Sequence, residues 1–176
     1  QSVQTSYFLK YPFVAKIFPL GVTFSDSAYN LPTQDFLLNK FYPYFSSELE
    51  RLGIIEWSDK FDCEDFAAMY KILCQACHKN SRATQEGLAV GAIDYTKDSG
   101  EYHCINIAFT DKGLLFIEPQ SGKLLTLSKN EQNSIKGYAF RSIIFAAILF
   151  LSGCAQKVKM PEVDYALIQD ILGRFV

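Results

Sequence analysis

The first half of the chain carries hydrophobic residues at helical spacing. Residues 36–41 follow Pro32, and proline suits the first turn of a helix, so the spacing predicts a short helix here. A second helix is expected over residues 42–52, and Gly53 ends it. Residues 54–57 then form a brief extended or loop segment.

A longer helix is predicted over Cys63–His78. Asp62 is a good N-cap residue, and Asp65 adds negative charge to the first turn, where the helix dipole favours it. Five residues form an apolar stripe at helical spacing: Phe66, Met69, Tyr70, Leu73 and Cys77. One face of this helix is therefore suited to burial.

The second half of the chain has the pattern of a β-sheet. Four segments rich in β-branched and aromatic residues are expected to be strands, the last being the weakest: residues 88–95, 102–109, 114–118 and 123–127. The polar runs 96–100 and 110–113 each end in a glycine, as hairpin loops do. Helices followed by an antiparallel sheet predict an α+β fold, with the Cys63 helix packed on the sheet.

The composition is that of one folded domain. The 176 residues are 49% hydrophobic, 15% aromatic and 20% charged, without a long low-complexity run. The formal net charge is −2 and the basic residues are scattered, which argues against nucleic acid as a partner. Aromatic residues near the start are expected in the core, a partner surface being the alternative: Tyr7, Phe8, Tyr11, Phe13 and Phe18.

Cys63 is a candidate nucleophile because it stands at the start of a predicted helix. The positive end of the helix dipole lowers a thiol pKa and favours the thiolate, which is the reactive form. The chain has two histidines. His78 lies at the far end of the same helix, so His103 is the better candidate for a base near Cys63.

Strand pairing predicts a partner for His103. If residues 111–112 form a two-residue hairpin turn, His103 faces Gln120. Glu118 is then its diagonal neighbour on the same sheet face, close enough for the carboxylate to hydrogen-bond the imidazole. Packing of the Cys63 helix across that face would complete a nucleophile, a base and an orienting carboxylate. The alternative is structural, with a small buried residue at Cys63 and a core histidine at His103.

Three segments resemble one known family. FDCEDFA at residues 61–67, His103 with Asn106, and FIEPQSGK at residues 116–123 resemble the papain-like domain of the Marasmius oreades agglutinin family of fungal lectin-proteases and its phage and bacterial relatives. The similarity covers residues 57–127, under half of the chain. It implies a papain-like fold in which N-terminal helices, including the nucleophile helix, pack on a C-terminal antiparallel sheet.

The resemblance also assigns roles to individual residues. In that family the cysteine is the nucleophile, the histidine is the base and the glutamate orients the histidine. The matching residues of this sequence are Cys63, His103 and Glu118. Gln120 follows as a supporting residue.

Calcium is the cofactor that the resemblance implies, and only as an activator. The fungal protease is activated by calcium through acidic residues near its cysteine, and the matching candidates here are Glu64 and Asp65. No other cofactor is expected. The sugar-binding repeats of the fungal lectin are absent from this sequence, so the resemblance does not imply glycan recognition.

Residues 141–154 have the layout of a bacterial lipoprotein signal. A basic residue, Arg141, precedes a short apolar run, and small residues precede Cys154. The apolar run 143–151 is about half the length of a membrane-spanning helix. LSGC resembles a lipobox, which predicts diacylation of Cys154 by chains such as palmitate and anchoring in a bacterial cell envelope, facing the periplasm. The alternative is a buried core helix that ends at Gly153.

A signal of this kind belongs at the start of a precursor. We therefore expect a rotated order, in which residues 141–176 precede Gln1 and an amphipathic helix at 155–176 continues into residue 1. The papain-like unit is then expected at 1–140 and the signal-like segment at 141–154. A proteolytic peptide that crosses the junction between the two would contradict the rotation.

A haem-attachment motif on the Cys63 helix suggests a different function from the cysteine-hydrolase site. Cys74, Cys77 and His78 fit C-x-x-C-H, the pattern that attaches c-type haem. Cys77 belongs to the predicted buried stripe, which favours plain structural cysteines, and a redox dithiol or a disulfide is a further alternative. A zinc site would need a second pair of ligands, which the sequence does not offer.

The sequence thus predicts a cysteine hydrolase, a peptidase or amidase, anchored to a bacterial membrane as a lipoprotein and acting on a peptide or protein substrate. The first alternative is a catalytically inactive papain-like lipoprotein that binds an envelope or phage protein. The second alternative is a small haem lipoprotein.

Overall fold

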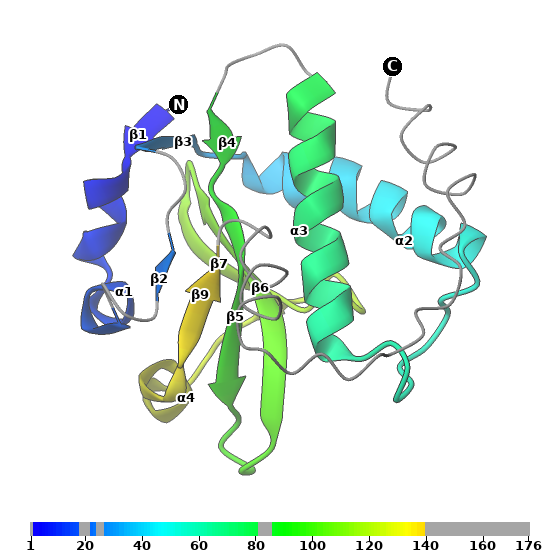
Figure 1. Ribbon diagram of the computed structural model, residues 1–176. Coiled ribbons are helices and arrows are strands. Elements are labelled where there is room, and N and C mark those ends of the chain that lie inside the picture. Colours follow the sequence, from blue (N-terminus) through cyan, green and yellow to red (C-terminus); the bar gives the residue numbers. More distant parts are fainter. Residues whose placement is uncertain (1, 18–21, 24–26, 81–85, 140–176) are drawn as a thin grey trace, which may run out of the picture.

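The computed structural model, drawn in Figure 1, describes residues 2–17, 22–23, 27–80 and 86–139. Three predicted features lie outside the described residues: the signal-like segment 141–154 with Cys154, the helix at 155–176, and Phe18. Within the described part of the chain, no helix is both long enough and apolar enough to cross a membrane.

The described strands form two sheets. The larger sheet has the order β2-β9-β5-β6-β7-β8, and the smaller one has the order β1-β3-β4. Neighbouring strands are antiparallel, except that β2 with β9 and β3 with β4 are parallel. The strand bounds are β1 Ser2–Gln4, β2 Val22–Thr23, β3 Ala28–Asn30, β4 Gly87–Leu88, β5 Val90–Thr96, β6 Tyr102–Thr110, β7 Gly113–Ile117, β8 Leu124–Leu125 and β9 Gly137–Ala139.

Helices lie on both sides of the larger sheet. Figure 1 shows α2 and α3 on one side and α1 on the other. The helical segments are a 3-10 helix η1 Thr5–Lys10, α1 Pro12–Ile17, a π-helix η2 Phe36–Phe41, α2 Tyr42–Arg51, α3 Cys63–Asn80 and α4 Lys129–Ser134. The predicted mixed α+β class is therefore confirmed.

The long helix and the central hairpin follow the predicted pattern. α3 begins at Cys63, where Asp62 Oδ1 accepts the Glu64 N–H at 3.0 Å and Asp65 Oδ2 accepts the Asp62 N–H at 3.1 Å. β6 and β7 pair with Thr110 opposite Gly113, which is the register of a two-residue turn. The predicted register is confirmed.

The two faces of β6 belong to two different cores. The odd-numbered face packs against residues of η1 and α1 through Ile105, Ile107 and Phe109. The even-numbered face packs against α2 and α3 through Ala108. On this second face, Asn106 Nδ2 also donates a hydrogen bond of 2.8 Å to the Ala67 carbonyl oxygen of α3. α3 therefore covers the even-numbered face.

This arrangement corrects the predicted docking of the Cys63 helix. We expected the helix to cross the face of β6 that carries His103. His103 lies instead on the odd-numbered face, which α3 does not cover, and there its ring makes an edge-type contact with the Tyr95 ring. The physical reason is that large isoleucine and phenylalanine side chains fill the odd-numbered face. N-terminal aromatic residues cover them, so the helix packs where the strand offers Ala108 and Asn106.

The N-terminal aromatic residues are part of the core, as predicted. Phe8 and Phe13 are buried, and the Phe8 ring lies 4.6 Å from the Phe109 ring, between centroids. Tyr7 and Tyr11 are partly buried against the same cluster. These contacts explain why the segment ahead of the predicted helices belongs to the domain.

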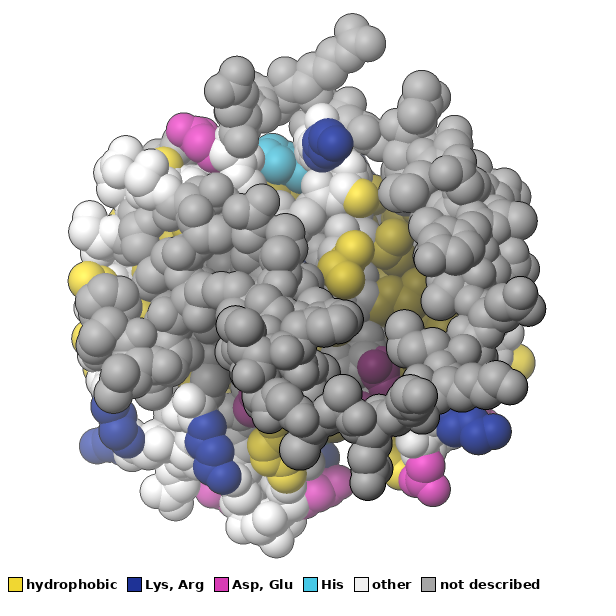
Figure 2. Space-filling model, viewed as in Figure 1, with side chains coloured by type: hydrophobic (Ala, Val, Ile, Leu, Met, Phe, Trp, Pro, Cys, Tyr) yellow, Lys and Arg dark blue, Asp and Glu magenta, His cyan; other side chains and the backbone are white. Residues whose placement is uncertain are grey.

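In Figure 2 the dark blue Lys and Arg side chains of the described residues lie toward the rim of the view, and magenta Asp and Glu side chains lie near several of them. The short helix α4 was not predicted, although it begins with a capping box: Ser128 Oγ accepts the Glu131 N–H, and the Glu131 carboxylate accepts the Ser128 N–H.

Candidate active site

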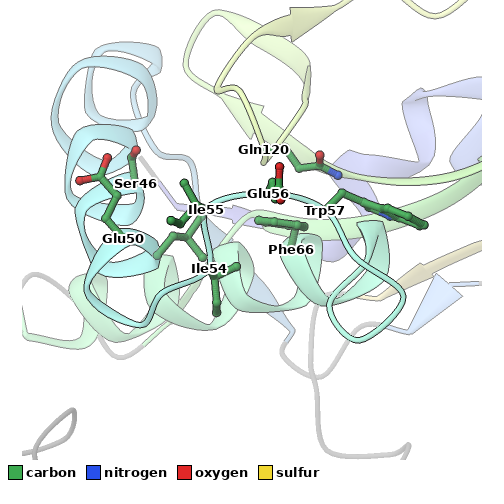
Figure 3. Close-up of a pocket in the computed structure, with 9 residues that line it drawn as sticks. Ser46, Glu50, Ile54, Ile55, Glu56, Trp57, Phe66 and Gln120 are labelled. Atoms are coloured by element: carbon green, nitrogen blue, oxygen red, sulfur yellow. The ribbon is translucent and has the colours of Figure 1, made fainter.

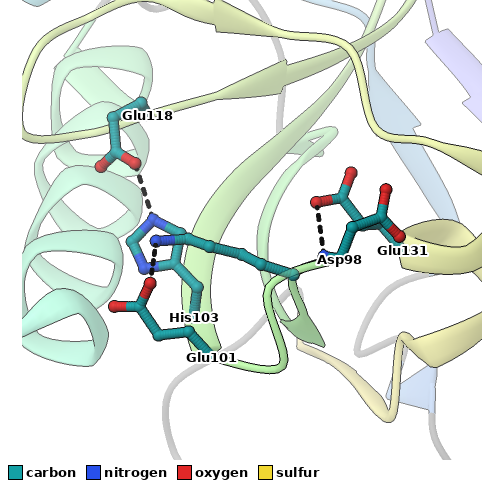
Figure 4. Close-up of polar contacts among 6 residues, drawn as sticks. Asp98, Glu101, His103, Glu118 and Glu131 are labelled. Carbon is teal, nitrogen blue, oxygen red and sulfur yellow. Dashed lines mark hydrogen bonds and ion pairs between the residues drawn. The ribbon is translucent and has the colours of Figure 1, made fainter.

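A histidine and a glutamate form a short hydrogen bond at one end of the larger sheet. His103 Nε2 lies 2.7 Å from Glu118 Oε2, and the two side chains point toward each other in Figure 4. His103 is 8% exposed and Glu118 is partly buried. Because Glu118 engages Nε2, the other ring nitrogen, Nδ1, is left to face a different partner.

Glu118 is held in place by the turn that follows β7. Its N–H donates to the Lys123 carbonyl oxygen at 2.9 Å, and the Gly122 N–H donates to the Glu118 carbonyl oxygen at 2.8 Å. The second carboxylate oxygen, Oε1, accepts the Gln120 N–H at 3.3 Å. Each carboxylate oxygen of Glu118 therefore has a donor, one from the imidazole and one from the backbone.

Gln120, the predicted supporting residue, contacts Glu118 through its backbone, while its side chain is exposed. Its carbonyl oxygen accepts the Tyr42 hydroxyl at 3.2 Å, which ties the turn to α2. Tyr42 also lies against Gly122, where an added Cβ would come within 2.6 Å of the ring. Gly122 has a φ of +67°, so this position suits glycine for both reasons.

Strand β6 has an open edge beside His103. The Phe109 N–H bonds to Ala89, so odd-numbered residues of β6 direct their backbone groups toward β5 and even-numbered residues direct theirs toward β7. β7 ends at Ile117, opposite Asn106. Cys104 is the next even-numbered residue, and in the described sheet no β7 residue is paired with it.

The Cys63 thiol lies at this open edge, beside the backbone of Cys104, and this contact lowers the pKa of the thiol. Cys104 directly follows His103 in β6. α3 brings Cys63 from the even-numbered face, whereas His103 belongs to the odd-numbered face. The structure therefore brings the predicted nucleophile and base to the same point of the strand, but from opposite faces.

The helix position of Cys63 predicts an activated thiolate, but the surroundings of the thiol shift its pKa the other way. Burial raises its pKa, and the nearby carboxylates of Asp62 and Glu64 raise it further, while backbone hydrogen bonds lower it by less. The predicted lowering of the pKa was wrong, because partial burial and two flanking acids outweigh the end of the helix. These surroundings therefore favour the protonated thiol over the thiolate.

The C-x-x-C-H motif lies on the buried side of α3. Cys74 is 0% exposed inside the α2–α3 core, and burial raises its pKa well above the ordinary value. His78 Nε2 lies 3.0 Å from the Glu86 carbonyl oxygen. This placement does not fit covalent haem, because a thioether at Cys74 would force a macrocycle into the packed core. Cys74 and Cys77 are free thiols, so the motif does not form a disulfide.

The predicted calcium ligands stand at the start of α3. Asp65 uses a carboxylate oxygen to accept the Asp62 N–H, and Glu64 is exposed. Among the described residues, no group of three or more His, Cys, Asp or Glu side chains is arranged to hold a metal ion. Calcium activation stays a prediction of the family resemblance.

A pocket beside the site was not predicted from the sequence. It lies between α2, the loop that follows it and the first turn of α3, and Figure 3 shows Gln120 at its edge. Its apolar lining consists of Leu49, Ile54, Ile55, Trp57 and Phe66. The signal in the sequence is Ile55 and Trp57, two large apolar residues that a loop exposes, whereas Ile54 beside them packs against the core of α2 and α3.

The fold and the site together define an α+β domain with a cysteine, a histidine and a glutamate gathered at one end of its sheet. Two solved structures are similar to this chain. A complex of PSL1a, a Polyporus squamosus lectin, with E64 has a TM-score of 0.61 and 24% identity, over 79% of this chain and 50% of that one. Polyporus squamosus lectin bound to the human-type influenza-binding epitope Neu5Aca2-6Galb1-4GlcNAc has a TM-score of 0.52 and 25% identity, over 68% of this chain and 42% of that one.

These similarities show a fold shared with part of a fungal lectin. This chain spans half or less of the solved chains that it matches. No protein-family model matches it, and no curated protein sequence matches it.

Proposed function

We propose that this protein is a cysteine hydrolase with a papain-like fold and site, acting on amide bonds of peptides or proteins. The observation that carries the proposal is the 2.7 Å contact between His103 and Glu118, next to the strand edge where the Cys63 thiol lies beside the backbone of Cys104. A thiol, an imidazole and a carboxylate that orients the imidazole are the parts that nucleophilic acyl transfer needs.

Because the raised pKa of Cys63 favours the protonated thiol, proton transfer accompanies its attack. His103 takes the thiol proton at Nδ1 while the sulfur bonds to the substrate carbonyl carbon, and the carbonyl electron pair moves onto oxygen. When the C–N bond breaks, the imidazolium gives this proton to the leaving amine and a thioester remains. Water then attacks the thioester, His103 takes a proton from that water, and cleavage of the C–S bond returns the proton to sulfur.

Glu118 acts on this cycle through His103. Its carboxylate accepts the Nε2 hydrogen, which fixes the tautomer that presents Nδ1 as a base and stabilises the imidazolium that forms. The backbone hydrogen bond from Gln120 to the other carboxylate oxygen keeps the carboxylate in this orientation. Gln120 is therefore a positioning residue in this mechanism.

The proposal is tested by the rate at which iodoacetamide alkylates Cys63 compared with Cys77, read by mass spectrometry across pH 6–9. Cys77 is the matched control because both thiols are half-buried and burial raises both pKa values. We expect Cys63 to react faster than Cys77, and we expect His103→Ala to remove the difference. E64, an epoxide reagent for reactive thiols, should label Cys63 with the same dependence on His103. Equal rates for the two thiols in the unchanged protein would overturn the proposal.

The raised pKa of Cys63 favours a second candidate, a papain-like scaffold that binds a partner without catalysis. An envelope or phage protein is the partner expected from the lipobox-like segment and the phage and bacterial relatives of the resembled family. The lectin similarity adds carbohydrate as a ligand class to test, because one similar chain is described with a bound sialylated trisaccharide. This candidate predicts an inert Cys63 together with saturable binding of that trisaccharide or of an envelope protein in calorimetry.

We also propose that Cys154 carries a lipid that anchors the protein in a bacterial envelope. The support is the LSGC sequence, which resembles a lipobox. In bacteria fed an alkyne analogue of palmitate, we expect label on the unchanged protein and on Cys77→Ser, and none on Cys154→Ser. Label that persists in Cys154→Ser would contradict the anchor.

A further inference from the structure

The pocket beside the site has a volume of about 310 Å³, at the low end of the range for ligand pockets. In Figure 3, Glu50 and Ser46 of α2 lie on one side of it, and Gln120 and Trp57 lie on the other. Phe66 of α3 lies between them. Three separate segments of the chain thus meet around one cavity.

The pocket lining adjoins both parts of the candidate active site, which are Cys63 on α3 and the pair of His103 and Glu118. Phe66 stands less than one helical turn after Cys63 on α3. Gln120 donates its backbone N–H to Glu118, which in turn bonds His103. A polypeptide that places a carbonyl group at Cys63 would therefore bring one of its side chains within reach of this pocket.

Two carboxylates stand at the pocket, and no basic side chain lines it. The carboxylates are those of Glu50 and Glu56, both on exposed residues. Within the described part of the chain, neither side chain forms an ion pair. The pocket thus combines apolar walls with two negative charges that no cation of the described residues balances.

Large apolar side chains are exposed at the same place. Ile55 is 84% exposed and Trp57 is 53% exposed, although residues of this kind are normally buried. Trp57 has the aromatic face that binds cations best. The exposed indole and the two carboxylates favour the same type of ligand, one that has an apolar stem and a positive end.

We propose that this pocket is a specificity site for a basic side chain, arginine or lysine, of a peptide substrate. The inference rests on the proposed hydrolase function and names the substrate class for that site. The aliphatic stem of the ligand lies along Ile54 and Phe66, and its cationic group reaches the Glu56 carboxylate and the face of Trp57, while Glu50 adds negative charge on the other side of the pocket.

Other side chains fit this chemistry less well. An aliphatic side chain would pack on the apolar walls but would leave the two carboxylates without a partner and partly desolvated. An acidic side chain would meet charges of the same sign. A peptide with a positive charge in this pocket is therefore the one that the lining favours.

The test measures binding to Cys63→Ala protein, so it does not depend on catalysis. The probe is a fluorescein-labelled nonapeptide of glycine and alanine with one central arginine, and its matched control has citrulline, which keeps the shape and lacks the charge. By fluorescence anisotropy we expect the arginine peptide to bind about fivefold more tightly, the size typical of solvent-accessible ion pairs, and we expect the ratio to fall as salt is raised.

Variants locate the preference. The double variant Glu50→Gln, Glu56→Gln should bring the ratio of the two affinities close to one, whereas Asp111→Asn, which removes one charge in the β6–β7 turn, should leave it unchanged. Circular dichroism checks that each variant is folded. Equal affinity for the two peptides, a ratio that survives the double variant, or no measurable binding of either peptide would overturn the inference.

The two proposals can fail separately. If Cys63 proves inert toward iodoacetamide while the charge preference persists, the hydrolase proposal fails and the pocket stands as a binding site for basic peptides. If Cys63 is reactive and the preference is absent, the hydrolase proposal stands and the specificity inference fails.

Discussion

Two cysteines of α3, one at the start of the helix and one in its C-terminal half, lie in different surroundings. Cys63 at the first residue of the helix is half-buried and lies at an open strand edge near His103. Cys74, near the other end, is fully buried among apolar side chains, and His78 bonds to a backbone oxygen. A cysteine at the start of a helix that meets an open edge of a sheet can be reached by a substrate, and one in the middle of the packed face cannot.

The comparison also shows that thiol activation needs more than a helix terminus. Burial raises the pKa of both Cys63 and Cys74, so in both cases it favours the protonated thiol. What distinguishes Cys63 is its position beside the backbone of Cys104, the residue that follows His103, whose Nε2 is held by Glu118. The difference between the two ends is thus a difference in neighbours and access, not in the resting charge of the thiol.

The largest expected effect is that of Cys63→Ser on hydrolysis. We expect the rate of cleavage of unfolded casein to fall by more than about 1,000-fold, because loss of a nucleophile leaves only the contributions of binding and the oxyanion site. The same change at Cys77 should leave the rate unchanged. Loss of activity in Cys77→Ser with retention in Cys63→Ser would reverse the assignment of the two ends.

Glu118→Gln is expected to have the next largest effect. Glutamine can keep a hydrogen bond to His103, but it does not stabilise the imidazolium and can favour the wrong tautomer, so we expect kcat to fall by about 100-fold or more. Glu101→Gln is the matched control because Glu101 stands two residues before His103 in the chain but pairs with Lys97 at 3.0 Å. Equal losses in the two variants would show that general charge, and not the contact with His103, matters.

Gly122→Ala should disturb the site through the turn that carries Glu118. The φ of +67° and the Tyr42 ring 2.6 Å from the added Cβ both oppose alanine, so we expect kcat to fall by about tenfold and stability by about 1–3 kcal/mol. Gly53→Ala is the control, since Gly53 has a φ of +72° and open space around its Cβ position. It should lose stability with little change in kcat. If both variants lose only stability, the turn does not position Glu118.

Much of the site was predictable because its determinants are local. The N-cap at Asp62 fixes the start of α3, and the two-residue turn between Thr110 and Gly113 fixes the register that makes Glu118 a neighbour of His103. Side-chain parity along a strand then follows without knowledge of the rest of the fold. The meeting of His103 and Glu118 therefore needed only the spacing of residues in one hairpin.

The features that sequence reasoning missed depend on packing between distant segments. The face of β6 on which α3 packs is decided by the N-terminal aromatic residues, such as Phe8, that fill the other face. The raised pKa of Cys63 depends on burial, which a helical pattern does not reveal. The pocket is built from α2, the loop at 54–57 and Gln120, which come together only in the folded chain.

Cys74→Ser should affect stability and leave the reactivity of Cys63 unchanged. A hydroxyl in the apolar core of α2 and α3 is costly without a hydrogen-bond partner, so we expect the free energy of unfolding to fall by about 1–3 kcal/mol. Urea denaturation with a reductant present measures the change. Cys77→Ser, at a half-buried position, should cost less. A large loss of Cys63 alkylation in folded Cys74→Ser would show that the two ends of the helix are coupled.

The smallest expected effect is on the pH dependence of stability. The folded pKa of Cys74 lies well above the ordinary value of 9.0 because the thiol is buried. The contribution of the Cys74 thiol to the free energy of unfolding is therefore complete below pH 9.0. As the pH rises from there toward the folded pKa, this contribution is lost by about 1.4 kcal/mol per pH unit, because only the unfolded thiol ionises in that range. Urea denaturation between pH 8 and 10.5 should show a shallower decline in Cys74→Ala than in the unchanged protein. Cys63→Ala should change the slope less, because Cys63 is only half-buried. Equal slopes in the two variants would mean that the thiols at the two ends of α3 are equally accessible to solvent.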